Sequence, residues 1–258
     1  MPNTPSEQKP VRIASEKSRP SIFWVLASIA LPILAIMTRF TVTDGNKLPR
    51  TGAYVLAPNH YSEIDPVIIG AITWKLGRIP RFLAKGSLFR IPVVGWILRK
   101  SGQIPVERAG TSRSHEPLRA AEALVENGRV IIIYPEGSLT RDPDLWPMRG
   151  KTGAARMALE HDIPVIPIAH WGPQDVMARY SKKFSFFPRK TIAVKVGDPV
   201  DLSGFRGRNL DSATLNEATS VIMSGITALL EDLRGEEAPA VRWNPSQHDQ
   251  KETGRFEA

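Results

Sequence analysis

The chain has 258 residues, of which 42% are hydrophobic, which suits one α/β domain with modest extensions and excludes a polytopic membrane protein. Lys and Arg outnumber Asp and Glu by 34 to 26, for a formal net charge of +8. This surplus favours anionic partners: phospholipid surfaces, phosphorylated metabolites, coenzyme A, acidic carrier proteins or nucleic acid. Cysteine is absent, which excludes disulfides, thiolate–metal sites and a cysteine-based acyl-enzyme.

Two segments precede the first strand that the pattern predicts. Residues 1–20 are polar and basic without an apolar period, which predicts a flexible arm. Residues 21–37 carry no charge, and their length lies at the lower edge of the roughly 17–25 residues that span a bilayer core. Pro32 is expected to kink or break a helix there. A cleaved signal peptide is disfavoured, because residues 37–40 offer no small-x-small cleavage site.

For residues 21–47 we predict a membrane anchor, either a short span or a segment inserted into one leaflet, with a buried core helix as the alternative. Basic residues lie on both flanks of the apolar run, so the positive-inside rule does not decide between these two modes of insertion.

From residue 48 to residue 234, short apolar runs alternate with amphipathic stretches. The pattern predicts strands over residues 54–57, 81–84, 103–106, 130–134, 165–169 and 191–196. It predicts helices over residues 66–74, 115–126, 152–160 and 209–233, with an apolar segment at 88–98. The alternation indicates an α/β catalytic domain, a central mixed sheet flanked by helices. Residues 235–258 are polar and predict a disordered tail.

The first candidate site is the segment 59–65 (NHYSEID), between a buried strand and a helix. A histidine there can accept a proton from a hydroxyl, and does so better when a carboxylate supports its other ring nitrogen. His60 and Asp65 are five residues apart, so a turn can bring them together; Glu63 is a second candidate, expected to point elsewhere. The alternative is a loop histidine and an aspartate that caps the helix beginning at Pro66. Further metal ligands at compatible spacing are absent from this segment.

The second candidate site is the segment 134–138 (YPEGS), which follows the most apolar predicted strand. Glu136 can hydrogen-bond an acceptor hydroxyl or hold a catalytic loop together. Gly137 allows a ligand to approach the backbone closely. An ordinary turn with a solvated Glu136 is the alternative.

Basic residues near predicted strand ends form the third candidate, a phosphate site if several converge on one face. The members of this set are Lys85, Arg108, Arg141, Arg149 and Lys151. Residues 150–152 (GKT) match the end of a phosphate-binding loop, but Leu145 stands where that loop requires glycine. Of the other histidines, His170 follows a buried strand and could face the site, although a structural role is favoured for it.

Four segments, taken in order, resemble the sequence blocks of the glycerolipid acyltransferase family, best known for its 1-acylglycerol-3-phosphate acyltransferases. Residues 59–65 are similar to its N-H-x-S-x-x-D block. Residues 85–89 with 102–108 are similar to its second block, which ends in arginine. Residues 134–138 are similar to its F-P-E-G-T block, and 163–168 (IPVIPI) to its fourth. The resemblance covers roughly residues 48–200.

The resemblance implies that His60 takes the proton from an acceptor hydroxyl as its oxygen attacks an acyl thioester, with Asp65 as its support. It implies substrate contacts from a wider set: Asn59, Lys85, Arg108, Glu136, Gly137, Ser138 and Arg141. Backbone N–H groups near the His60 loop are expected to stabilise the developing oxyanion. In the third block the arginine is displaced by two positions, to Arg141, and this departure bears on acceptor identity more than on the chemistry.

The function that these features predict is acyl transfer from acyl-CoA or acyl carrier protein to lysophosphatidic acid at the cell membrane, on the cytoplasmic face. No metal and no cofactor beyond the acyl donor is expected. Glycerol 3-phosphate, another lysophospholipid or a glycolipid are alternative acceptors. A non-catalytic membrane protein that binds lipid or coenzyme A is the alternative from another class. Nucleic-acid binding lacks a recognisable module.

Overall fold

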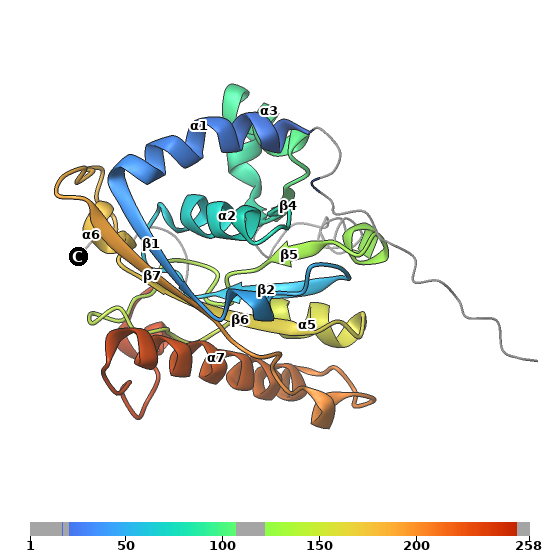
Figure 1. The fold of residues 1–258 in the computed structure, drawn as a ribbon. Coiled ribbons are helices and arrows are strands. Elements are labelled where there is room, and N and C mark those ends of the chain that lie inside the picture. The colour runs from blue at the N-terminus through green and yellow to red at the C-terminus, as the bar shows by residue number, and fades with distance from the viewer. Residues whose placement is uncertain (1–16, 18–20, 107–121, 252–258) are drawn as a thin grey trace, which may run out of the picture.

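The computed structural model describes residue 17 and residues 21–106 and 122–251 (Figure 1). Its centre is a five-stranded sheet in the order β1-β7-β6-β2-β5. The strands are β1 (Thr38–Thr43), β2 (Tyr54–Pro58), β5 (Val130–Ile132), β6 (Val165–Trp171) and β7 (Lys190–Val196). All neighbouring pairs are parallel except β6 and β7, which confirms the predicted mixed sheet.

Helices cover both faces of this sheet (Figure 1). On one face lies α2 (Asp65–Lys75), with α1 (Ile22–Met37) packed outside it; on the other lie α5 (Gly153–Glu160) and α7 (Ser212–Arg234). The side chains of β2 alternate between the two cores, as the period of a strand requires. Tyr54 and Leu56 pack in the core beneath α2, whereas Val55 and Ala57 pack against α5 and α7.

A smaller unit stands beside the sheet. Its strands β3 (Leu83–Lys85) and β4 (Ile104–Val106) are parallel, and α3 (Pro92–Lys100) connects them after a 3-10 turn over Gly86–Arg90. An isolated bridge from Phe82 to Ile132 joins this unit to β5. The remaining elements are α6 (Pro173–Val176) and 3-10 turns over Gly45–Lys47, Ser203–Phe205 and Pro245–His248.

The strand β1 was not predicted, and it lies inside the range assigned to the membrane anchor. It pairs with β7 along its whole length, from Thr38 opposite Lys190 to Thr43 opposite Lys195. The boundary predicted between residues 47 and 48 therefore does not separate two structural units. The reason is that β1 is an edge strand whose mixed sequence TRFTVT acquires its structure from pairing with β7.

The helix α1 has an apolar outer surface. It continues through Pro32, so the predicted break does not occur. Within the described parts of the chain, no helix has both the length and the apolar character to cross a membrane. The inner side of α1 packs on the core through Leu34 and Met37. The large side chains left exposed on it are Trp24, Val25, Ile29, Ile33 and Ile36.

Residues 235–251 are ordered, so the prediction of a disordered tail is wrong for this range. The carbonyl oxygen of Trp243 accepts a hydrogen bond from the Arg149 N–H at 2.8 Å, and that of Lys251 accepts one from Arg141 Nε at 3.1 Å. The rings of Trp243 and His248 stack with their centroids 3.6 Å apart. The polar composition gave a wrong prediction of disorder, because this tail is held by hydrogen bonds to its backbone carbonyls and by the ring of Trp243.

Two other predictions fall partly outside the described residues. The flexible arm over residues 1–20 lies outside them except for residue 17. Of the helix predicted over 115–126, residues 122–126 are described and are helical.

Candidate active site

Three strand ends bring the candidate catalytic groups together. His60 follows β2, Glu136 follows β5, and His170 is the penultimate residue of β6. Because β6, β2 and β5 are parallel neighbours, their carboxyl ends meet at the same edge of the sheet, where α/β folds place their ligands.

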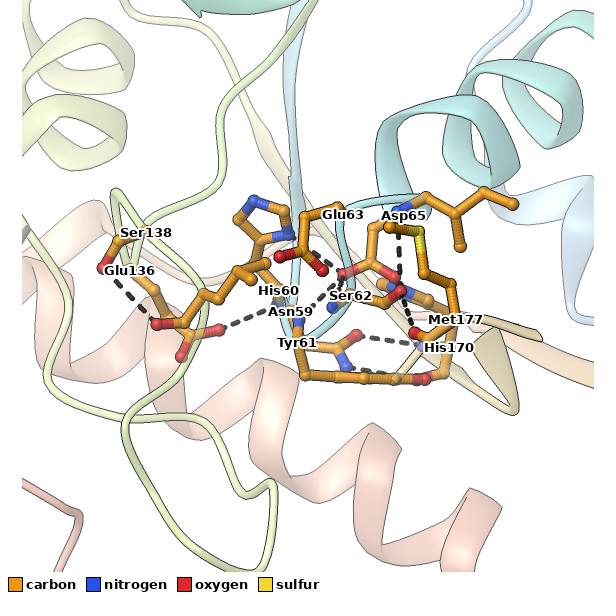
Figure 2. Close-up of polar contacts among 12 residues, drawn as sticks. Asn59, His60, Tyr61, Ser62, Glu63, Asp65, Glu136, Ser138, His170 and Met177 are labelled. Atoms are coloured by element: carbon orange, nitrogen blue, oxygen red, sulfur yellow. Dashed lines mark hydrogen bonds and ion pairs between the residues drawn. The ribbon is translucent and has the colours of Figure 1, made fainter. Parts of the chain in front are cut away.

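The side chains of His60 and Asp65 are in contact, as predicted: Nδ1 of His60 lies 3.0 Å from Oδ2 of Asp65 (Figure 2). The same oxygen accepts the backbone N–H groups of Tyr61 and Ser62, each at 2.8 Å. Asp65 is the first residue of α2, and its carboxylate binds these residues before the helix, so it is not a simple cap.

Asp65 is fully buried, which alone would raise the pKa of its carboxyl. The neighbouring imidazoles of His170 and His60 outweigh the effect of burial and hold that pKa well below its ordinary value. An ionised carboxylate can only accept hydrogen bonds, so Nδ1 of His60 carries the proton in the neutral ring. Nε2 of His60 is then the atom that can accept a proton from a substrate.

The His60 ring stacks on Tyr134, with centroids 4.1 Å apart, and its side chain is 16% exposed. In Figure 2 the second ring nitrogen of His60 lies on the side of the imidazole away from Asp65. A base held against an aromatic ring and open at one nitrogen is suited to proton transfer.

The backbone of His60 is fixed from the other side by the YPEGS segment. Oε1 of Glu136 accepts the His60 N–H at 2.8 Å, and Oε2 accepts the Met148 N–H at 3.0 Å. The carbonyl oxygen of His60 accepts the Thr140 N–H at 2.7 Å. Glu136 is fully buried, and burial raises the pKa of its carboxyl to about 8, against the opposing effect of the N–H groups of Met148 and His60. Glu136 therefore holds the catalytic loop, the second of the two roles that the sequence allowed.

His170, for which the sequence favoured a structural role, lies against Asp65 in the candidate site. Its imidazole is fully buried, and Nε2 lies 3.0 Å from Oδ1 of Asp65. Asn59 binds its backbone twice, donating from Nδ2 to the His170 carbonyl at 3.1 Å and accepting the His170 N–H at 3.0 Å. The available signal was its position at the end of a buried strand next to β2, which carries the base.

A large open cavity adjoins His60, with a volume of about 1080 Å³. This volume is slightly above the roughly 300–1,000 Å³ of ordinary ligand pockets. One wall is the inner side of α1, with Phe23, Leu26 and Leu31, and another comes from α3 and the strand before it. Three lysines also line the cavity: Lys85, Lys151 and Lys182. The cavity thus combines an extended apolar lining with positive charge beside a base.

Only part of the predicted substrate-binding set lines this cavity: Lys85, Gly137 and Ser138. Asn59, Glu136 and Arg141 are not among the described residues that line it. Arg141 is 3% exposed, and its guanidinium binds the Tyr180 hydroxyl and the Lys251 carbonyl. Arg141, which lies two positions later than the arginine of the family's third block, is therefore buried away from the cavity. Arg108 lies outside the described residues.

The expected oxyanion site near the His60 loop is not formed by residues 60–62. The N–H of His60 is bound by Glu136, and those of Tyr61 and Ser62 are bound by Asp65. These three donors are already engaged by the carboxyl groups of the candidate site. Glu63 lines the same cavity as His60, and its carboxylate accepts the Tyr180 N–H at 3.0 Å.

Comparison with known proteins agrees with this geometry. A family model described as Acyltransferase matches residues 39–171, just over half of the chain. A chloroplastic 1-acyl-sn-glycerol-3-phosphate acyltransferase of Brassica napus is 31% identical over 123 residues, which are 48% of this chain and 34% of that protein. The chain thus spans about a third of that relative. A 1-acyl-sn-glycerol-3-phosphate acyltransferase of Saccharomyces cerevisiae is 22% identical over 88% of this chain and 75% of its own length.

Among solved structures, the fold is similar to that of the 1-acyl-sn-glycerophosphate (LPA) acyltransferase PlsC from Thermotoga maritima. The TM-score is 0.60 at 23% identity, over 84% of this chain and 82% of that one. The family match contains both the His60–Asp65 pair and Glu136. The chain therefore belongs to the Acyltransferase family.

Proposed function

We propose that this protein is an O-acyltransferase that moves a fatty acyl chain from a thioester to the free hydroxyl of 1-acylglycerol 3-phosphate, giving phosphatidic acid. The observation that carries the proposal is the buried Asp65 behind His60, at the wall of an apolar cavity that also holds lysines. The names of the relatives from Brassica napus and Saccharomyces cerevisiae favour the same acceptor.

In the proposed reaction, Nε2 of His60 takes the proton of the acceptor hydroxyl as that oxygen attacks the thioester carbonyl carbon. The tetrahedral intermediate then collapses with cleavage of the C–S bond, and the imidazolium returns the proton to the departing thiolate. Asp65 remains ionised throughout and stabilises the imidazolium. The chain supplies base and support, and the mechanism needs no cofactor beyond the acyl donor, which is acyl-CoA or acyl carrier protein.

The cavity offers a separate environment to each part of the substrates. The lysines Lys85 and Lys151 can form charge-assisted hydrogen bonds with the acceptor phosphate. The apolar wall formed by α1 and α3 can hold acyl chains, because burying each methylene is favourable by about 0.8 kcal/mol. A cavity that offers both lysines and an apolar wall beside His60 suits a monoacyl phosphate acceptor.

We also propose that the protein lies on the cytoplasmic face of the cell membrane, with α1 inserted into one leaflet. A helix that lines the cavity on one side and exposes large apolar side chains on the other places the cavity beside lipid. α3 lies near α1 at the same end of the molecule and exposes Val93 and Trp96 (Figure 1). The net charge of +8 adds attraction to anionic lipid.

The activity is tested with purified protein in detergent, one long-chain acyl-CoA or acyl carrier protein, and a panel of acceptors followed by mass spectrometry. The panel holds 1-acylglycerol 3-phosphate, glycerol 3-phosphate, a neutral lysolipid and a glycolipid. Formation of phosphatidic acid that His60→Ala abolishes and His161→Ala leaves intact supports the proposal, since His161 lies at the end of α5 outside the cavity.

Two results would count against the proposed reaction. Transfer to another acceptor alone keeps the chemistry but replaces the substrate. No transfer to any acceptor by a folded protein that binds acyl-CoA would favour the non-catalytic alternative.

Membrane insertion is tested by flotation with vesicles of neutral and anionic phospholipid. Ile29→Asp and Val93→Asp should each reduce the bound fraction, because a charge in the interface opposes insertion. Val241→Asp is the matched control, since Val241 is also exposed, at 79%, but lies outside α1 and α3. Equal binding by all variants would exclude this surface.

A further inference from the structure

Asp65 is contacted by two imidazoles, one on each carboxylate oxygen. His60 uses Oδ2, and Nε2 of His170 lies 3.0 Å from Oδ1. Both His170 and Asp65 are fully buried. This approach is not aligned as a hydrogen bond in the structure: among the described residues, Oδ1 of Asp65 and both ring nitrogens of His170 have no hydrogen-bond partner. Among the residues that the structure describes, Nε2 of His170 is thus the polar atom recorded next to Oδ1 of Asp65.

The surroundings of His170 determine whether its ring is cationic or neutral. A cationic ring would carry a proton on Nδ1, where a buried donor without an acceptor is unfavourable by about 1–3 kcal/mol. A neutral ring with its proton on Nε2 leaves only an unprotonated nitrogen at that place. This tautomer places the ring N–H 3.0 Å from an ionised carboxylate, which needs donors when it is buried.

The position of His170 is fixed independently of Asp65. Asn59, the residue before the base, binds both backbone groups of His170. The Tyr61 hydroxyl donates to the His170 carbonyl at 2.8 Å, and the two rings stack with centroids 5.1 Å apart. The end of β6 is therefore locked to the loop that carries His60, and Nε2 of His170 is a fixed point for the carboxylate.

We propose that His170 is a positioning residue: its Nε2–H holds Oδ1 of Asp65, so that Oδ2 stays directed at Nδ1 of His60. The inference rests on the proposed function of His60 as the general base. The backbone N–H groups of Tyr61 and Ser62 already hold Oδ2 in place. The contact of His170 with Oδ1 therefore fixes the second oxygen, and with it the plane of the carboxylate that faces Nδ1 of His60. A misplacement of about 1 Å in such a constellation can reduce the rate on the order of 10²-fold.

Two substitutions separate this role from simple core packing. His170→Phe keeps an aromatic ring against Tyr61 but removes the N–H, whereas His170→Gln removes the ring but keeps an amide N–H of similar reach. A positioning role predicts that kcat falls on the order of 10²-fold in H170F and about tenfold or less in H170Q. A packing role predicts the opposite order, with H170F the more active variant. That order, or equal rates in the two variants, would overturn the inference.

The pH profile supplies a readout that packing would not change. When one donor to Asp65 is removed, the carboxylate interacts more strongly with the His60 imidazolium. The acidic limb of kcat/KM should therefore move to higher pH in H170F and stay near its wild-type position in H170Q. The other titratable groups that face or line this site are unchanged in both variants: Tyr61, Glu63, Tyr134, Glu136, Lys85, Lys151 and Lys182.

The failure of the inference can be told from failure of the proposed function. Wild type and His60→Ala are assayed in parallel, so an active wild type and an inactive His60→Ala variant establish the reaction first. If the wild type transfers no acyl group, ¹⁵N NMR of the His60 imidazole still reports the contact. Its titration midpoint should then rise in H170F and not in H170Q, and an unchanged midpoint in both would refute the positioning role.

Discussion

The carboxyl group of Glu136 accepts the backbone N–H of His60 at 2.8 Å, a hydrogen bond between residues 76 positions apart. The second oxygen of Glu136 accepts the Met148 N–H. The loop after β5 therefore fixes the backbone of the residue whose side chain Asp65 fixes. His60 is held at both ends, by the carboxyl group of Glu136 on its backbone and by the carboxylate of Asp65 on its ring.

Glu136→Gln should lower kcat by roughly ten- to a hundredfold and leave the acceptor KM nearly unchanged. Each oxygen of Glu136 accepts one N–H, and an amide has only one oxygen, so a buried donor is left unpaired at about 1–3 kcal/mol. The KM is spared because Glu136 does not line the cavity. Steady-state kinetics on the acceptor check this. Asp142→Asn is the control, a buried carboxylate that binds Asp144 and Trp146 instead of His60.

The same substitution should flatten the fall of thermal stability as pH rises from about 4.3 to about 8. Burial raises the pKa of Glu136 to about 8, so the folded protein holds the proton more tightly than the unfolded chain does. The contribution of this group is fully present below the ordinary glutamate pKa of about 4.3 and is lost as pH rises through about 8. Tm measured from pH 5 to pH 9 should fall more steeply in the wild type. Parallel curves would show that Glu136 does not titrate in this range.

Asp65→Asn should reduce kcat on the order of 10²–10⁴-fold, because the amide cannot support the imidazolium as an ionised carboxylate does. It should also remove an acid-sensitive part of the stability. The pKa of Asp65 is held below its ordinary value, so its contribution is present above about pH 3.9 and is lost as pH falls below that value. Tm between pH 7 and pH 3 checks this. Asp211→Asn, at the N-cap of α7, should leave kcat unchanged.

Gly137→Ala should raise the acceptor KM, whereas Gly207→Ala should not. Both glycines have φ near +70°, where a side chain is unfavourable by about 1–2 kcal/mol, so both variants should lose similar stability. A Cβ on Gly137 would lie 2.9 Å from Cδ of Lys151 and displace that lysine, while a Cβ on Gly207 meets nothing within 4 Å. Kinetics and Tm measured together check this. The same KM in both variants would mean that the placement of Lys151 is unimportant.

Lys85→Met should raise KM for a phosphate-bearing acceptor by roughly 10- to 150-fold, the equivalent of a charge-assisted hydrogen bond of about 1.5–3 kcal/mol. KM for a neutral lysolipid should change little, since that acceptor offers no phosphate. Lys100→Met is the matched control, because Lys100 ends α3 and does not line the cavity. An equal rise for both acceptors would indicate a packing role for Lys85 and not a phosphate contact.

Local patterns along the sequence determined much of this architecture. The apolar run at β5 and the alternation of strands and helices predict the mixed α/β sheet, because burial on both faces of a central strand leaves a direct mark on composition. His60 and Asp65 could be paired from sequence because five residues form a turn whose closure depends little on the rest of the chain. The four motifs, because they occur in the family's order, indicated the family.

The tertiary structure alone decided which residues complete the site. His170 is 105 positions from Asp65, and only the pairing of β6 with β2 brings its Nε2 to the carboxylate. Glu136 and Arg141 were separated from the cavity by burial, which a motif does not report. The edge strand β1 and the ordered tail were missed for the same reason: their stability comes from hydrogen bonds to distant backbone groups, which leave no periodic trace in the sequence.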